Sequence, residues 1–198
     1  MASSQLLIRI SFTALFAALT ALGAFIIIPV GPVPIVVQNL FALLSGLILG
    51  PFMGSISVSL YLLAGVLNFP VFSGGGGGIV RFAGPTGGYL IGYLMAALTA
   101  GLIAGRPGNE TNKHRSSTEC HREEDQLRSI RLIIAVAAGL LVVYIPGLIW
   151  LKISQHLSWQ KTFLAGCIPF VFGDIIKGIT AVLIAPRLRR IAAGYLEA

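Results

Sequence analysis

Charged residues are scarce in this sequence of 198 residues. Only 11% of the residues are Asp, Glu, Lys or Arg, while 56% are hydrophobic, and an average soluble domain is about a quarter charged. The mean hydropathy is +0.88. This composition excludes an ordinary soluble protein. It indicates an integral membrane protein with room for roughly six spans of about 20 residues, and we expect one compact bundle without a separate soluble domain.

Histidine and cysteine are also few, three and two respectively. All three histidines lie in connections outside the apolar segments, so no Ser-His-Asp or Cys-His catalytic group can be assembled. The spacing of His114, Glu119, Cys120 and His121 matches no common zinc pattern, and we expect neither a metal nor a cofactor. The segment 84–88 lacks the Lys-Ser/Thr pair of a phosphate-binding P-loop, so the chain has no nucleotide-binding motif of its own.

Apolar stretches, interrupted by proline, glycine or polar residues, predict an all-α membrane protein with six spanning helices. The spans are predicted at residues 6–29, 35–49, 51–67, 86–105, 132–151 and 162–185. The second is short for a full crossing. We expect the polar segment 106–131 to be a solvated loop, Ile145-Pro146-Gly147 to be a weak point, and the last span to end at Pro186.

The formal net charge of +7 reflects an uneven distribution of cations along the chain. Ten of the 14 Lys and Arg residues lie in the two tails and in the 106–131 loop, whereas Arg81, Lys152 and Lys161 lie on the opposite side of the predicted bundle. The positive-inside rule therefore places both termini in the cytoplasm, and it explains the charge better than binding to nucleic acid does. The Pro-rich turn, the glycine-rich stretch and the connection between the last two spans then face outward, where they could form a site that is loaded from outside.

Arg81 is the single charged side chain between Arg9 and Arg106. An isolated cation is costly in so apolar a segment, so a binding role for an anionic partner is one interpretation. The other is an interfacial arginine that contacts lipid headgroups. The neighbouring run of five glycines, residues 74–78, favours binding, because glycine lets the backbone approach a ligand closely and offers N–H donors. A helix that begins at Thr86, with Thr86 as its N-cap, would add a positive dipole end that suits a carboxylate.

Asp174 and Lys177 lie three residues apart in the last span, which places both on one helix face. They could bind a shared polar ligand. They could also form a buried ion pair that only fixes helix packing, or Lys177 could extend to the membrane surface. Gln38 is a further polar residue at membrane depth, and either a helix–helix hydrogen bond or a ligand contact would explain it.

Small residues recur four apart on the first span, as Ala14 with Ala18 and Ala17 with Ala21. Such a face allows another helix to approach closely. Packing within the chain and docking to a second membrane protein are both open.

Several motifs together resemble one known family. They are Val33-Pro34-Ile35-Val36-Val37-Gln38, Phe69-Pro70-Val71-Phe72, the glycine run, Gly84-Pro85-Thr86-Gly87-Gly88-Tyr89-Leu90 and Gly173-Asp174-Ile175-Ile176-Lys177. In this order they resemble the BioY family, the biotin-binding S components of energy-coupling factor (ECF) vitamin transporters. The resemblance implies a six-helix S-component bundle in the bacterial cytoplasmic membrane, surrounded by lipid, with an outward-facing biotin pocket. It also implies transport without enzymatic chemistry, together with a transmembrane coupling protein that docks on the alanine face and two ATPase subunits that use ATP.

The resemblance further implies roles for individual residues. Arg81 would pair with the biotin carboxylate, helped by glycine N–H groups. Asp174 would accept from a ureido N–H, and Lys177 would donate to the ureido carbonyl or hold Asp174, although the Arg81 and Lys177 roles could be exchanged. Phe72 could pack on the bicycle. Further candidate binding residues are Gln38, Asn68, Gly84, Thr86 and Tyr89.

Two alternatives remain open from the sequence. The chain could be an S component or uniporter for another small carboxylated vitamin. It could also be an intramembrane enzyme that acts on lipid, with Asp174 and Lys177 as acid and base, although Cys167 is a poor candidate for its nucleophile.

Overall fold

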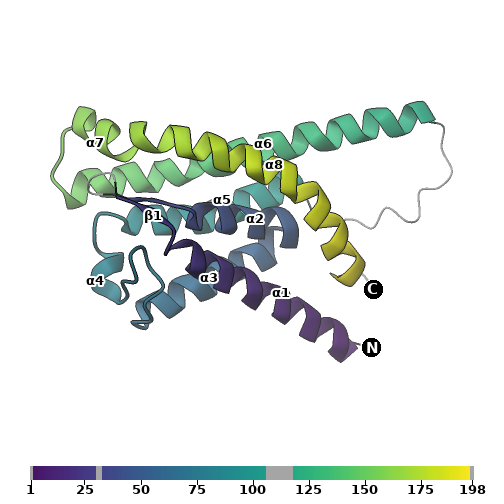
Figure 1. The fold of residues 1–198 in the computed structure, drawn as a ribbon, viewed down its shortest axis with the longest axis horizontal. Coiled ribbons are helices and arrows are strands. Elements are labelled where there is room, and N and C mark those ends of the chain that lie inside the picture. Colours follow the sequence, from purple (N-terminus) through teal and green to yellow (C-terminus); the bar gives the residue numbers. More distant parts are fainter. Residues whose placement is uncertain (1, 30–32, 106–117, 197–198) are drawn as a thin grey trace.

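A computed structural model describes residues 2–29, 33–105 and 118–196 of the chain. Helices dominate it, as Figure 1 shows. The elements in chain order are α1 (Ala2–Gly23), β1 (Ile27–Ile28), β2 (Ile35–Val36), α2 (Gln38–Leu49), α3 (Pro51–Val66), α4 (Ile79–Phe82), α5 (Gly87–Ala104), α6 (Thr118–Ser154), α7 (Trp159–Gly166) and α8 (Ile168–Leu196).

Each of the six predicted spans has a helical counterpart. Four helical stretches are long and apolar enough to cross a membrane. They are Gln5–Gly23, Gly87–Ala104, Gln126–Ser154 and Trp159–Tyr195. The shorter apolar helices α2 and α3 complete the set. The predicted fold class, an all-α membrane bundle, is confirmed.

Both termini lie at one end of the bundle, while α4, α7 and the β1–β2 hairpin lie at the opposite end (Figure 1). Helix α6 runs along the length of the molecule, and α5 packs against it. Helix α2 has contacts with α1, α3, α5, α6 and α8. Eleven of its 12 residues are buried, as expected for a helix that is apolar on every face. It is therefore the central helix of the bundle.

The first span is shorter than predicted. Helix α1 ends at Gly23, where an added Cβ would lie 2.9 Å from the Gln38 Cα atom. The chain then extends, and β1 pairs antiparallel with β2, with Ile27 opposite Val36. A short apolar run does not distinguish helix from strand, and β-branched isoleucines favour the extended form once the helix has ended.

The prediction of a loop over residues 106–131 is wrong for residues 118–131, which are helical. Helix α6 begins at Thr118, whereas residues 106–117 lie outside the described part. Polar composition cannot separate a loop from a helix that projects beyond the membrane, and Glu, Arg, Gln and Leu are good helix formers. Helix α6 also continues through the predicted weak point at Pro146. In a membrane bundle, neighbouring groups can compensate for the hydrogen bond that proline removes.

The last span also differs from its prediction. It is interrupted at Cys167, between α7 and α8, and α8 then continues past Pro186 to Leu196. Pro169 occupies the second position of α8, where proline is compatible with a helix start. The extension beyond Pro186 carries Arg189 back to the bundle.

Arg189 connects α8 to the carboxyl ends of two other helices. Its Nη1 donates to the Leu47 carbonyl in α2. Its Nη2 lies 3.1 Å from the Ala104 carbonyl and 3.0 Å from the Gly105 carbonyl at the end of α5. The last carbonyls of a helix have no partner within it, and a cation also suits the negative end of the helix dipole. Arg189 therefore stabilises the end of the bundle that contains both termini.

Candidate functional site

A cavity lies among the amino-terminal turns of α2 and α5, the middle of α6 and the first half of α8. The open space inside its lining, including the part continuous with the outside, is about 550 Å³. Its lining consists of Val33, Pro34, Val36, Gln38, Asn39, Phe72, Ser73, Thr86, Tyr89, Leu90, Tyr93, Val143, Tyr144, Phe170, Asp174 and Lys177. Most of these residues are apolar or aromatic.

Aromatic rings form much of the cavity wall. The rings of Tyr89 and Phe170 lie 6.3 Å apart between centroids, at an angle of 32°. Phe72 enters from the glycine-rich loop and meets Tyr61 edge-on at 5.7 Å. Such walls offer a large apolar surface to a compact ring system.

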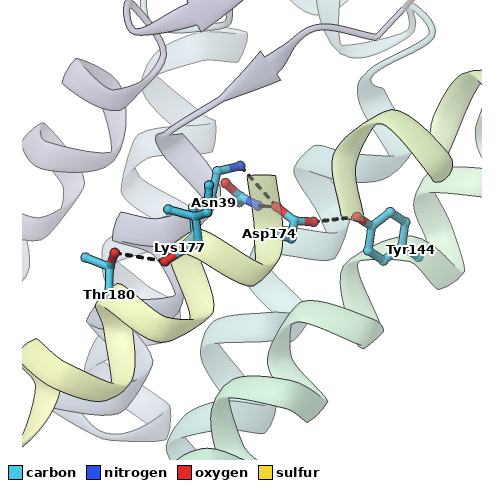
Figure 2. Close-up of polar contacts among 6 residues, drawn as sticks. Asn39, Tyr144, Asp174, Lys177 and Thr180 are labelled. Atoms are coloured by element: carbon cyan, nitrogen blue, oxygen red, sulfur yellow. Dashed lines mark hydrogen bonds and ion pairs between the residues drawn. The ribbon is translucent and has the colours of Figure 1, made fainter. Parts of the chain in front are cut away.

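One polar cluster is built around Asp174 in this apolar wall (Figure 2). Lys177 Nζ lies 3.0 Å from Asp174 Oδ1. Asn39 Nδ2 lies 2.9 Å from the same oxygen and donates to it. The Tyr144 hydroxyl donates to Asp174 Oδ2. Asp174 and Lys177 are 9% and 8% exposed, so three donors from three helices compensate for the desolvation of this carboxylate.

Three other predicted residues line the cavity. Gln38 Nε2 donates to the Tyr61 hydroxyl of α3, so Gln38 combines a helix–helix hydrogen bond with a place at the cavity. The Tyr89 hydroxyl donates to the Gly166 carbonyl at 2.7 Å, where α7 ends. Thr86 is the residue before α5, but its side chain makes no capping hydrogen bond, contrary to its predicted use as an N-cap.

The glycine-rich loop is folded against the bundle. The N–H groups of Gly74, Gly75 and Gly78 donate to the carbonyls of Ala24, Phe72 and Gly65. All three glycines have positive φ angles of 75°, 72° and 85°, which non-glycine residues adopt at a cost. The N–H groups of these three glycines are therefore used within the fold.

Three predicted binding residues do not line this cavity. Arg81 is exposed on the short helix α4, and its Nε atom would lie 2.5 Å from a Cβ added to Gly76. Asn68 is exposed, with φ 73°. The Gly84 carbonyl accepts from Trp150 Nε1 at 2.8 Å, which ties the start of α5 to α6. Their binding roles stay predictions.

The alanine face of α1 divides into two. Ala14 and Ala18 are exposed, whereas Ala17 and Ala21 are partly buried against the core. The second pair therefore takes part in packing within the chain, and the first remains available for a partner.

Sequence reasoning missed Asn39, Ser73, Tyr93, Tyr144 and Phe170 as cavity residues. The best signal was at Asn39, a second amide directly after Gln38 in an otherwise apolar segment. No group of three or more His, Cys, Asp or Glu residues in the described ranges could hold a metal ion. The candidate metal residues Glu119, Cys120, His121 and His114 have side chains outside the described part.

Comparison with known proteins gives a consistent result. Residues 1–194 match the BioY family. A protein of Pyrococcus horikoshii, named "Probable biotin transporter BioY", is 39% identical over 91% of this chain and 96% of its own length. The biotin transporter BioY of Thermotoga maritima is 35% identical over 89% of this chain and 93% of its own. That of Rhizobium etli is 34% identical, with 92% of each chain covered.

A solved structure has the same fold. It is a crystal structure of the S-component for biotin from an ECF-type ABC transporter. The TM-score is 0.80 at 30% identity, over 96% of this chain and 95% of that chain. The resemblance noted from the motifs is confirmed, and the relatives are named as transporters rather than enzymes.

Proposed function

Since this chain belongs to the BioY family, we propose that it is the substrate-binding component of a biotin transporter, which binds biotin and mediates its uptake across the membrane. Biotin combines an apolar bicycle, a neutral ureido group with two N–H donors and one carbonyl acceptor, and a carboxylate on a flexible tail. The cavity supports this assignment, because its wall is mainly apolar and aromatic with one compact polar cluster.

The observation that carries the proposal is the placement of Asp174 and Lys177 together in that wall, 3.0 Å apart. Asp174 Oδ1 accepts from both Lys177 and Asn39, whereas Oδ2 accepts from Tyr144 and keeps one lone pair for a ureido N–H. Lys177 carries three N–H donors and can meet the ureido carbonyl while it holds Asp174. A packing-only ion pair would not require a cavity beside it.

Arg81 is the proposed partner of the biotin carboxylate. The adjacent Phe82 supports this role, because its ring lies 6.4 Å from that of Phe72, which lines the cavity. Arg81 is exposed, so its ion pair would contribute modestly to affinity unless the loop closes over the ligand. Lys177 is the alternative partner.

The direction of transport follows from the charges. The two tails and the 106–131 segment together carry ten of the 14 Lys and Arg residues, and the tails lie at one end of the bundle, so we place that end in the cytoplasm and the end with α4 and α7 outside (Figure 1). The bacterial cytoplasmic membrane is the proposed location. We further propose that an ECF coupling protein docks on the exposed Ala14 and Ala18, and that two ATPase subunits supply ATP hydrolysis.

Equilibrium binding of labelled biotin to the purified chain in detergent tests the proposal. We expect saturable binding that excess unlabelled biotin displaces and that a carboxylated vitamin with different ring chemistry does not. Displacement by the other vitamin alone would instead support an S component or uniporter for that compound. Asp174→Asn should weaken biotin binding at least about tenfold, because an amide replaces the shared acceptor.

Thr180→Ala is the matched control on the same helix. Thr180 is half-buried, lies outside the cavity, and donates to the Ile176 carbonyl of α8 (Figure 2). Its variant should bind biotin like the wild type. Unchanged biotin binding by Asp174→Asn would contradict the proposed contact between Asp174 and the ureido group. A methyl ester of biotin that binds as tightly as the acid would contradict the proposed ion pair between Arg81 and the carboxylate.

A further inference from the structure

Asn39 has a buried oxygen that the fold does not use. The residue is 8% exposed and lies at the start of α2, in the cavity wall. Its Nδ2 donates to Asp174, but its Oδ1 has no hydrogen-bond partner within the described part of the chain. A buried acceptor that is left unpaired costs free energy, so a donor is expected to meet it when the cavity is filled.

The orientation of this amide is fixed by its neighbour. Asp174 Oδ1 can only accept from Asn39, so the amide nitrogen must face the carboxylate, 2.9 Å away. Reversal would bring the amide oxygen against the carboxylate, acceptor against acceptor. Figure 2 shows the nitrogen directed toward Asp174 and the oxygen directed away from it.

Asn39, Lys177 and Asp174 adjoin one another in the wall, because Asn39 and Lys177 both donate to the same oxygen of Asp174. Together they offer an acceptor on Asn39, a donor on Lys177 and an acceptor on Asp174. A cyclic urea presents the complementary order of N–H donor, carbonyl acceptor and N–H donor. We infer that Asn39 Oδ1 accepts a hydrogen bond from one of the two ureido N–H groups, with Asp174 accepting from the other. This inference rests on the proposed function.

Two other buried oxygens without a hydrogen-bond partner in the described residues provide a comparison for Asn39 Oδ1. Besides Asn39 Oδ1, the described part of the chain has two buried side-chain oxygens without a partner, Ser57 Oγ and Ser73 Oγ. Ser73 lines the same cavity, whereas Ser57 is fully buried in α3 and does not. The unpaired oxygens of Asn39 and Ser73 thus belong to residues that a ligand in the cavity can meet, whereas Ser57 lies away from the cavity and serves as the reference.

The test uses three ligands on the full chain in detergent. They are biotin and its two ring-carbamate analogues, in each of which oxygen replaces one ureido N–H. When the ring oxygen of a carbamate faces Asn39 Oδ1 or Asp174, the hydrogen bond of the ureido N–H is lost and two acceptors face each other. Wild-type protein should therefore bind each carbamate at least about tenfold more weakly than biotin. In Asn39→Leu, the penalty for one carbamate should fall to about threefold or less, and the penalty for the other should persist.

Ser57→Ala should retain both carbamate penalties of the wild type. Thermal unfolding in detergent checks that each variant is folded, and Asn39→Ala replaces the leucine variant if that one is not. Equal weakening of all three ligands in Asn39→Leu would overturn the inference, because Asn39 would then only hold Asp174 in place. Wild-type protein that binds biotin and a carbamate within about threefold of each other would also overturn it, with no variant needed. Wild-type protein that binds no biotin would overturn the proposed function itself, and this inference with it.

Discussion

Gly46 of α2 lies so close to Ala97 of α5 that a Cβ on Gly46 would be 2.0 Å from the Ala97 carbonyl oxygen. Two more glycines meet at this crossing. A Cβ on Gly54 of α3 would lie 2.6 Å from the Gly46 Cα atom, and one on Gly101 of α5 would lie 2.9 Å from the Gly46 carbonyl oxygen. Small residues let membrane helices approach to backbone contact, so the packing of the central helix depends on them.

Gly46→Ala should therefore destabilise the bundle. Overpacking of this kind costs about 1–3 kcal/mol, more than the gain in helix propensity from glycine to alanine. Thermal unfolding in detergent should show a lower midpoint. Gly194→Ala is the control, because a Cβ there meets nothing within 4 Å. Equal midpoints for the two variants would contradict the close crossing.

Lys177→Met should strongly lower the free energy of unfolding, although it places an apolar side chain in a mainly apolar wall. It leaves the Asp174 carboxylate buried with only Asn39 and Tyr144 as donors. Removal of one partner from a buried ion pair costs about 3–5 kcal/mol, whereas neutralising both partners is often much less costly. The free energy of unfolding should fall in Lys177→Met and recover in large part in the double variant Asp174→Asn with Lys177→Met.

The double variant also separates stability from binding. It should fold nearly as well as the wild type and bind biotin poorly, because both ureido partners are altered. A double variant that is no more stable than Lys177→Met would show that the two side chains are not energetically coupled.

Arg189→Lys should weaken the end of the bundle where the termini lie. A lysine has one nitrogen and cannot reach the Leu47, Ala104 and Gly105 carbonyls together, as the guanidinium does. We expect a loss of about 1–2 kcal/mol in the free energy of unfolding, from hydrogen bonds to a charged group. Arg187→Lys, an exposed position on the same helix, should be neutral. Faster hydrogen exchange at the ends of α2 and α5 would locate the effect.

Gly65→Ala should alter the cavity through Phe72. A Cβ on Gly65 would lie 2.1 Å from the Phe72 ring, so the ring must move. Because Phe72 lines the cavity, we expect a drop of about tenfold in biotin affinity and a smaller change in stability. Gly173→Ala is the comparison, since its Cβ would make an ordinary contact of 3.5 Å with Ile35. Retained affinity in Gly65→Ala would show that Phe72 is dispensable.

The sequence was most informative where a residue conflicted with its surroundings. Asp174 and Lys177 stood out because charges are rare in membrane helices, and the structure places both in the cavity wall. Asn39 and Tyr144 carry no charge, and uncharged polar residues are common enough in such helices to give a weak signal. Their role depends on which helix faces them, and the spacing along the chain does not contain that information.

Helix limits were predicted less well than the number of spans. Pro186 was taken as an end, yet α8 continues through it, whereas Pro169 stands at a true start. Proline is compatible with both positions, and the surrounding contacts decide between them. The isoleucines after Gly23 illustrate the same limit, because apolarity alone does not select strand or helix.

The length of α2 has a further consequence for the space inside the molecule. Its 12 residues span about 18 Å, against a hydrocarbon thickness of about 30 Å. Because protein encloses this helix on nearly every side, bilayer thickness does not set its length, and the helix is about 12 Å shorter than that thickness. Gln38 and Asn39, at the first turn of α2, line the cavity together with Val36 of the hairpin strand β2. In this small bundle, a central helix shorter than the hydrocarbon thickness thus leaves space for a ligand cavity at its amino-terminal end.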